Sequence, residues 1–244
     1  MRIVATIEAR MTSSRLPGKV LRPVLGRPLL SHMIERLRRS WQLDQVVVAT
    51  THNETDDPIA ELAAGLGVGC FRGSEDDVLS RVLGAAQAHD ADLIVETTGD
   101  CPLIDPEVVD QMIATFLSNK VDYCANVLKP TYPRGMDVQV FPTEVLARVE
   151  QLTTDPADRE HVSLYIYEHP GQFRLLNVSS GLREADAEHR LTVDTAADLA
   201  LVEQVFERLY PSKPHFGLHD ILDLLRGDPV LAGLNRHITQ KAVR

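Results

Sequence analysis

The strongest constraint on the fold is an alternation of short apolar runs with longer segments of helical periodicity through the first half of the chain. The apolar runs have strand length and lie at residues 3–8, 45–50, 68–71 and 93–97. Strands that alternate with helices form βα units, whose strands pair in parallel and are covered by helices on both faces. The pattern therefore predicts an α/β fold with three αβα layers.

Helix-start signals lie between the predicted strands. Helices are expected over residues 28–40, after Asp57, near Ser74 and after Asp105. Proline directly follows Asp57 and Asp105, as expected for an N-cap and the first turn of a helix. Ser74 and Asp77 have the spacing of a capping box. These signals predict one helix after each of the four strands.

The second half of the chain mixes its elements. Short strands are expected over residues 138–141, 173–177 and 191–193, and helices over 143–152, 159–168, 196–209 and 218–226. Such strands would add antiparallel pairs to a mostly parallel sheet. Because the chain has no internal repeat, low-complexity stretch or Gly/Ser-rich linker, residues 1–244 are predicted to form a single domain.

The charge of the chain is distributed unevenly. The formal net charge is −10, which argues against a broad surface for nucleic acid or anionic lipid. Residues 1–39 nevertheless hold nine basic and two acidic side chains. Three of the basic residues, Arg36, Arg38 and Arg39, are expected on a solvated helix face. The remaining basic residues form a block that suits a compact anion.

Two further features bear on the location of the protein. The sequence has no apolar run of 18 or more residues, so no membrane-spanning helix is expected, and its first residues enter a strand directly instead of a signal peptide. The three cysteines are too few and too widely spaced for a disulfide framework or a zinc ribbon. A cytoplasmic protein is therefore predicted.

A basic loop follows the first predicted strand. Ligands bind outside the carboxyl ends of the strands in an open parallel sheet, which is where residues 10–19 emerge. Small residues let backbone N–H groups approach an anion, and three cations can neutralise a triphosphate. The loop is therefore interpreted as a phosphate site, the alternative being a solvated basic loop. Its candidate residues are Arg10, Ser13, Ser14, Arg15, Gly18 and Lys19.

Standard nucleotide motifs do not explain this loop. A Walker A loop would need a glycine where Ser13 stands and a serine or threonine where Val20 stands. The glycines at 65, 67 and 69 follow a predicted helix and lack the last glycine of the dinucleotide motif. Both motifs are therefore rejected.

Two aspartates at predicted strand ends are candidate metal ligands. Asp105 can cap the helix that follows it, which leaves Asp100 free for another task. Thr195 and Asp198 have capping-box spacing, which likewise leaves Asp194 free. Mg²⁺ is usually held by one or two protein carboxylates together with substrate phosphates. Asp100 and Asp194 therefore predict a divided magnesium site, although Asp100 could alternatively be a turn residue.

Two other segments concentrate charge beside apolar stretches. Residues 133–138 include Asp137, and residues 158–161 include Arg159 and His161. His161 and Tyr165 are expected on one face of a helix, four positions apart. For both segments, ion pairing and helix capping remain an alternative to a functional role.

Taken together, these segments resemble the cytidylyltransferases that activate acidic sugars, the CMP-Kdo and CMP-sialate synthetase group. Among them, the branch known as spore coat polysaccharide biosynthesis protein F is the most similar. The resemblance runs through seven segments in the same order: RMTSSRLPGKVL, ATTHNETDDPIAELA, FRGSEDDVLSRV, TGDCPLIDPEVVD, RGMDVQVF, DREHVSLYIYEHP and RLTVDTAADLALVE.

The resemblance implies a Rossmann-like nucleotidyltransferase fold, CTP as donor, Mg²⁺ as cofactor and a homodimer. It places CTP binding in about residues 1–105, and acceptor binding and dimerisation in about 106–244. By motif position, Arg10, Arg15 and Lys19 would act on the CTP phosphates, and Asp100 and Asp194 would hold Mg²⁺. Gly73, Ser74 and Asp77 would bind the nucleoside. Asp137, Arg159 and His161 would face a small acidic acceptor.

The reaction that the resemblance implies is attack of an acceptor hydroxyl on the α-phosphorus of CTP, with release of pyrophosphate. A non-catalytic CTP-binding subunit is a competing hypothesis, but simple binding needs no pair of metal ligands. A cytidylyltransferase acting on a small phosphonate or another non-sugar acceptor is a further alternative. A glycosyltransferase would need an Asp-x-Asp motif at a strand end, and Asp90-Ala-Asp92 precedes its strand instead.

Overall fold

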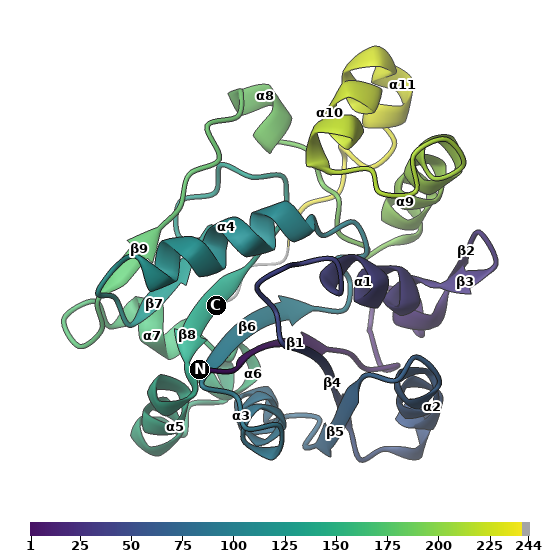
Figure 1. Ribbon diagram of the computed structural model, residues 1–244. Helices are drawn as coiled ribbons and strands as arrows, with labels where there is room; N and C mark the ends of the chain where they lie inside the picture. Colours follow the sequence, from purple (N-terminus) through teal and green to yellow (C-terminus); the bar gives the residue numbers. More distant parts are fainter. Residues whose placement is uncertain (241–244) are drawn as a thin grey trace.

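Seven strands form one sheet in the order β5-β4-β1-β6-β8-β7-β9 in the computed structural model, which describes residues 1–240 (Figure 1). Parallel pairing joins β1 with β4 and β6, β4 with β5, and β7 with β9, whereas β8 is antiparallel to β6 and β7. The predicted mostly parallel sheet with antiparallel additions is confirmed. The strands are Ile3–Glu8 (β1), Gln45–Thr51 (β4), Gly69–Gly73 (β5), Leu93–Thr98 (β6), Tyr123–Ala125 (β7), Gln139–Pro142 (β8) and Leu175–Asn177 (β9).

Helices cover both faces of the sheet, which gives the three predicted layers (Figure 1). The central strands are mostly apolar because both of their faces are buried, each in its own hydrophobic cluster. One face packs against α1 (Leu29–Leu37), α2 (Asp57–Gly65) and α4 (Pro106–Leu117). The helices α9 (Ala196–Leu209) and α10 (Leu218–Gly227) belong to the same hydrophobic cluster, and Phe206 of α9 contacts His32 of α1. The other face packs against α3 (Val78–Ala88), α5 (Thr143–Leu152) and α7 (Leu164–Glu168).

The order of the strands creates a crevice between β1 and β6. The chain leaves β1 for β4 and β5 on one side, and then returns to β6 on the other side of β1. Ligands of open α/β sheets bind at such a switch point, outside the carboxyl ends of the strands. The loop after β1 and the loop after β6 therefore face each other across this crevice.

Several short elements were not predicted. They are the 3-10 helices η1 (Lys19–Leu21) and η2 (Glu54–Asp56), the hairpin of β2 (Pro23–Val24) with β3 (Arg27–Pro28), and the helices α8 (Glu184–Ala187) and α11 (Pro229–Ala232). The strand β7 was also missed. All of them are too short to show a period in the sequence. The longest helix within residues 1–240, α9, has 14 residues, and no helix in this part of the chain could span a membrane.

The predicted strand over residues 191–193 is wrong. This segment is extended, but its hydrogen bonds go to two loops instead of a neighbouring strand. The Leu191 N–H donates to the Arg134 carbonyl at 2.7 Å, and the Val193 N–H donates to the Asp100 carbonyl at 2.8 Å. Because these partners lie on separate loops, the segment forms only an isolated bridge between Arg134 and Arg190.

Two helix predictions also need correction. The single helix expected over 159–168 is two short helices, α6 (Pro156–Glu160) and α7, because the chain turns at Val162, whose φ is 33°. His161 and Tyr165 therefore share no helix face, and Tyr165 stacks on His169 instead. The helix expected near Ser74 begins only at Val78. Its N-cap is Asp77, so residues 74 and 77 do not form a capping box.

Candidate active site

The loop after β1 closes on itself before it delivers Lys19 to the crevice. The Gly18 N–H donates to the Met11 carbonyl at 2.9 Å, and Gly18 has a φ of 69°, which glycine adopts at little cost. The Met11 N–H donates to Oδ1 of Asp56 at 2.8 Å, which ties the loop to η2. Ser13 and Ser14 lie at the outer turn of the loop, where Ser14 is exposed.

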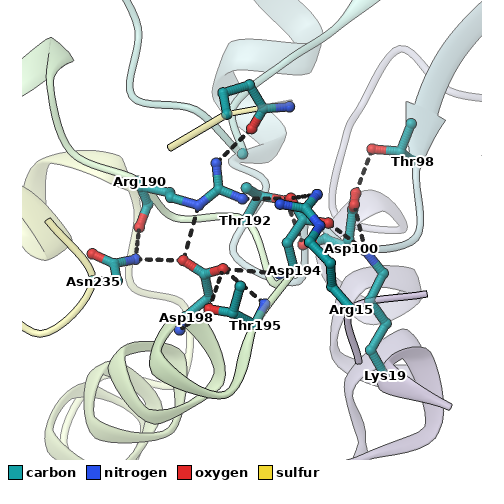
Figure 2. A network of polar contacts seen from close by, with 12 residues as sticks. Arg15, Lys19, Thr98, Asp100, Arg190, Thr192, Asp194, Thr195, Asp198 and Asn235 are labelled. Atoms are coloured by element: carbon teal, nitrogen blue, oxygen red, sulfur yellow. Dashed lines mark hydrogen bonds and ion pairs between the residues drawn. The ribbon is translucent and has the colours of Figure 1, made fainter. Parts of the chain in front are cut away.

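Lys19 is the centre of the site. Its Nζ lies 2.8 Å from Oδ2 of Asp100 and 2.8 Å from Oδ1 of Asp194 (Figure 2). The guanidinium of Arg15 reaches Oδ2 of Asp194 at 2.9 Å. Four of the predicted site residues, from three distant segments, are therefore in direct contact. Whether they perform the chemistry assigned to them stays a prediction.

The loop after β6 and the segment before α9 hold the two aspartates in place. The Thr98 hydroxyl donates to Oδ1 of Asp100 at 2.6 Å, which orients this carboxylate (Figure 2). The backbone carbonyl of Asp100 accepts from the Val193 N–H and, at 3.1 Å, from the Thr192 hydroxyl. These bonds align residues 192–194 alongside Asp100, so both carboxylates point at Lys19.

The charges of this cluster stabilise one another. Burial acts to lower the pKa of Lys19, but the carboxylates of Asp100 and Asp194 outweigh it, and this pKa is raised above its usual value. Burial acts to raise the pKa of Asp194, but Lys19, Arg15 and Arg190 together hold that pKa below its usual value. The site therefore keeps Lys19 cationic and Asp194 anionic at neutral pH.

No sequence signal indicated the buried network of polar side chains behind Asp194. Arg190 contacts the carboxylate of Asp194 and lies with its Nε 2.9 Å from Oδ1 of Asp198 (Figure 2). Asn235 donates to the Arg190 carbonyl at 2.9 Å and to Oδ1 of Asp198 at 2.8 Å. The capping box of Thr195 and Asp198 is confirmed. However, Asp198 is also fully buried and binds Arg190, a second role that capping-box spacing alone does not reveal.

Arg10 lies at the other end of the basic loop. Its guanidinium is 3.5 Å from Oε1 of Glu75, and the Thr12 hydroxyl donates to the same carboxylate. Glu75 belongs to the turn after β5, which also holds the nucleoside candidate Ser74 and directly follows Gly73, the last residue of β5. Glu75 thus joins this turn to the basic loop. The basic loop carries all three cations, but their carboxylate partners differ. Arg10 is paired with Glu75, whereas Arg15 and Lys19 are paired with Asp194.

Asp77 and Arg159 contact each other, although the resemblance assigned them to different substrates. Oδ1 of Asp77 accepts from the Ser80 N–H at 3.0 Å and from Nε of Arg159 at 2.9 Å. Burial acts to raise the pKa of Asp77, but Arg159 and the helix cap lower it below its usual value. Both side chains therefore have a structural task, and their roles in substrate binding stay predictions.

Asp137 and His161 lie on separate segments. Oδ2 of Asp137 accepts from the Gly135 N–H at 3.2 Å, and a side chain at Gly135 would meet the Leu191 backbone within 2.6 Å. Gly135 therefore lets this segment lie against residues 190–192, beside the aspartate pair. His161 ends α6 and is half-buried. Asp137 is close enough to the central cluster for the charges of Asp100 and Arg190 to act on its pKa. His161 directly follows α6, the helix that carries Arg159.

The two central aspartates fit a magnesium ion. Within residues 1–240, no group of three or more His, Cys, Asp or Glu side chains is arranged to hold a metal. Mg²⁺ does not need such a group, because it commonly takes one or two carboxylates and completes its shell with phosphate and water. Asp100 and Asp194 already place one oxygen each around a single cation, the Lys19 ammonium. Their donor set and convergence suit Mg²⁺.

Comparisons with known proteins agree with this fold. The sequence model of a family described as Cytidylyltransferase matches residues 4–216. Spore coat polysaccharide biosynthesis protein SpsF of Bacillus subtilis is 33% identical over 231 residues, covering 93% of this chain and 95% of that protein. A 3-deoxy-manno-octulosonate cytidylyltransferase of Geobacter metallireducens is 30% identical over 194 residues, covering 68% of this chain and 75% of that protein.

A solved structure is similar along the whole chain. The structure of a cytidylyltransferase from Leptospira borgpetersenii has a TM-score of 0.91 and 33% identity, and the match covers 99% of this chain and 100% of that one. With this fold and a site at its switch point, the protein is a nucleotidyltransferase. Because the family match covers most of its length, the chain belongs to the cytidylyltransferase family. The resemblance noted in the sequence is confirmed.

Proposed function

We propose that this protein transfers CMP from CTP to a hydroxyl group of a small acidic sugar of the Kdo or nonulosonic-acid type, with Mg²⁺ as cofactor and release of pyrophosphate. The observation that carries this proposal is the convergence of Arg15, Lys19, Asp100 and Asp194 at the switch point of the sheet. The family of the chain and the names of its relatives support CTP and an acidic sugar. The same names support a role in the synthesis of a surface polysaccharide.

The cations of the basic loop would act on the phosphates. When Arg15 and Lys19 exchange their carboxylate partners for phosphate oxygens, they neutralise the charge that builds on the leaving pyrophosphate. Arg10 would reach the same triphosphate from the far end of the loop. Such groups accelerate the reaction because they are already oriented before the charge develops.

The aspartates would hold the metal. Asp100 and Asp194 would bind Mg²⁺ once the Lys19 ammonium turns to phosphate. When bound, Mg²⁺ supplies charge neutralisation at the reacting phosphate. The Thr98 hydroxyl keeps Asp100 oriented, and Arg190 keeps Asp194 oriented. These contacts fix the carboxylates without help from the substrate.

The substrates would bind on two sides of this centre. The turn of Gly73, Ser74 and Asp77 would hold the nucleoside, since Glu75 in the same turn contacts Arg10. The acceptor would lie toward Asp137, beside which the exposed cation Arg134 can meet an acidic group. Arg159 and His161 would lie where the acceptor meets the nucleoside, because Arg159 contacts Asp77.

A pyrophosphate-release assay tests the proposal. The wild-type protein is offered CTP, ATP, GTP or UTP with Mg²⁺ and each of three acceptors, namely Kdo, a nonulosonic acid and a small phosphonate. We expect release with CTP and one sugar acid. Turnover with ATP or UTP but not CTP would overturn the choice of nucleotide, and turnover with the phosphonate alone would overturn the acidic sugar.

Two variants test the roles of the central residues. We expect Lys19→Met and Asp194→Asn to lose on the order of 10²- to 10³-fold in kcat/KM, as when a charge-stabilising donor is removed. Lys213→Met is the matched control, because Lys213 is exposed and paired with Asp220 away from the site. Tight CTP binding without turnover for any acceptor would favour a non-catalytic CTP-binding module.

A further inference from the structure

A group of buried polar atoms lies on the α3 side of β1 and β6. Four of the buried side-chain atoms that lack a hydrogen-bond partner within residues 1–240 come from β1, β6 and α3: Thr6 Oγ1, Glu8 Oε1, Glu96 Oε2 and Arg81 Nε. Thr6 and Glu8 are on β1, and Thr6 is in register with Glu96 on β6. The two strands are adjacent in the centre of the sheet (Figure 1). None of these four side chains has a role in the proposed reaction.

Glu8 and Glu96 lie diagonally from each other on the same face of β1 and β6, close enough for their carboxyl groups to interact. An ionised carboxylate can only accept hydrogen bonds, so two carboxylates cannot bond to each other without a proton between them. Glu96 is only 4% exposed and Oε1 of Glu8 is buried, so ionising both carboxyl groups would be costly. Above about pH 7, the pair therefore carries one shared proton and one negative charge.

The groups that surround the pair account for this state. Burial raises the pKa of Glu8 to about 7, although Arg81 and Arg10 pull it down, and Asp100 adds to the rise. Burial and the charge of Glu8 raise the pKa of Glu96 well above its usual range. Around Glu96 the neighbouring groups are neutral hydroxyls, those of Ser163 and Tyr123.

Arg81 connects the pair to the turn after β5. It is 2% exposed, and its Nη1 donates to the backbone carbonyls of Ser74 and Glu75, the latter at 3.2 Å. Arg81 also packs so closely under Gly73 that a Cβ there would lie 2.9 Å from its Cγ. A buried guanidinium needs an opposite charge, and Glu8 is the main carboxylate that supports it.

We propose that Glu8, Glu96 and Arg81 form a positioning unit, in which the carboxyl pair shares one proton and its single negative charge holds Arg81 beneath the Gly73–Glu75 turn. One positive charge then meets one negative charge, so the buried unit is neutral. The link to nucleotide binding rests on the proposed function, because that turn carries the nucleoside candidates. Glu75 extends the effect to Arg10 across the crevice.

Protonation of the pair gives a measurable signature. Because the pKa of Glu8 is raised from 4.5 to about 7 in the folded protein, the folded state binds protons more tightly than the unfolded chain. This stabilisation is complete below pH 4.5 and is lost as the pH rises toward 7. Glu8→Gln removes the group that titrates, so this pH dependence disappears. Glu96→Gln keeps it, because burial is the largest cause of the raised pKa of Glu8 and an amide replaces a protonated carboxyl group.

The first experiment measures urea unfolding midpoints of the wild type, Glu8→Gln, Glu96→Gln and the exposed control Glu61→Gln between about pH 4.5 and pH 8.5. We expect a midpoint that falls with rising pH in the wild type, Glu96→Gln and the control, and a flatter profile in Glu8→Gln. A wild-type profile in Glu8→Gln would overturn the titration of this pair, and a flattened profile in Glu96→Gln would show that Glu96 is ionised in the wild type and would overturn the shared proton. This measurement needs no nucleotide, so it stands whether or not the protein uses CTP.

The second experiment follows the turn itself. Hydrogen exchange of peptides that cover residues 73–78 is compared in the wild type, Glu8→Gln, Arg81→Met and Glu61→Gln. We expect exchange to accelerate about tenfold or more in Glu8→Gln and Arg81→Met, and to stay unchanged in the control. Glu8→Gln and Arg81→Met each remove a different member of the positioning unit, so the comparison can be made if only one of them folds. Wild-type exchange in either folded variant would overturn the positioning role.

The third experiment links the unit to the nucleotide. Calorimetric titration with CTP and Mg²⁺ should give about tenfold weaker binding in Arg81→Met and Glu8→Gln, and binding within about threefold of wild type in Glu96→Gln. Wild-type affinity in Arg81→Met would overturn the effect on the nucleotide. Failure of the wild type itself to bind CTP would overturn the proposed function, while the unfolding and exchange results would still decide the positioning unit.

Discussion

The ammonium nitrogen of Lys19 lies 2.8 Å from Oδ1 of Asp194, which stands 175 positions later in the chain. Lys19 touches Asp100 at the same distance, so one cation bridges two carboxylates from different loops. The contact brings together the loop after β1, the loop after β6 and the segment before α9. A phosphate would take Lys19 away from the aspartates and leave both carboxylates free for a metal. Nucleotide binding and metal binding are thereby linked at a single side chain.

Lys19→Met should increase the affinity for Mg²⁺ in the absence of nucleotide by about tenfold, because two neighbouring carboxylates then have no cation between them. The measurement is calorimetric titration with magnesium chloride. Lys213→Met should leave the affinity unchanged, since its partner Asp220 lies elsewhere. Adding Asp100→Asn to Lys19→Met should reverse the gain. A gain that survives in this double variant would show that the metal binds at another place.

Arg190→Met should destabilise the fold strongly. Arg190 is paired with Asp194 and Asp198, and Asp198 has no exposed surface. Removing the guanidinium leaves a buried carboxylate without its opposite charge, which typically costs about 3–5 kcal/mol. Urea unfolding gives the free energy. Arg174→Met is the matched control, because Arg174 pairs with Asp122 at the surface, and its loss should be far smaller. Equal losses would contradict the importance of the buried network.

Lys19 and Asp100 could be predicted from the sequence because each lies in a loop after a parallel strand, and these loops meet at one edge of the sheet. Asp194 could be identified because Thr195 and Asp198 account for the cap of α9, although the strand expected before Asp194 is wrong. The parallel strands could be predicted because both of their faces are buried, so their sequences are mostly apolar.

The rest depended on contacts that have no local signature. Arg36 was expected on a solvated helix face, but it is 3% exposed, donates to the Ile104 carbonyl at 2.7 Å and lies over the Phe216 ring. Its two partners are 68 and 180 positions away, so no period or motif predicts them. The segment over 191–193 has the composition of a strand, but its hydrogen bonds are decided by where the loops at Asp100 and Arg134 lie.

Asp105→Ala should cost more than an ordinary helix cap. Oδ1 of Asp105 accepts from the Glu107 N–H at the start of α4, and Oδ2 accepts from the Leu218 N–H at the start of α10. One buried carboxylate thus caps two helices, and its removal leaves both N–H groups without a partner. We expect a loss of about 2 kcal/mol or more. Asp155→Ala, at the exposed cap of α6, should lose about 1 kcal/mol. The comparison is made by urea unfolding, and equal losses would contradict the double cap.

The ionised carboxylate of Asp194 should contribute to stability at neutral pH and lose this contribution in acid. Lys19, Arg15 and Arg190 outweigh burial and hold the pKa of Asp194 below its ordinary value of 3.8. For a lowered pKa, the folded state releases the proton more readily than the unfolded chain, so the stabilisation is present above pH 3.8 and is lost as the pH falls through the folded-state value. Asp194→Asn keeps the shape of the side chain but removes the charge. The difference in unfolding free energy between wild type and Asp194→Asn should therefore be largest near neutral pH and shrink below about pH 4. Urea unfolding at several pH values measures this difference. The control is Asp76→Asn, at an exposed position in the turn before α3, and its difference from wild type should stay constant with pH. A difference for Asp194→Asn that does not change with pH would mean that its charge contributes nothing to the fold and that only its shape matters.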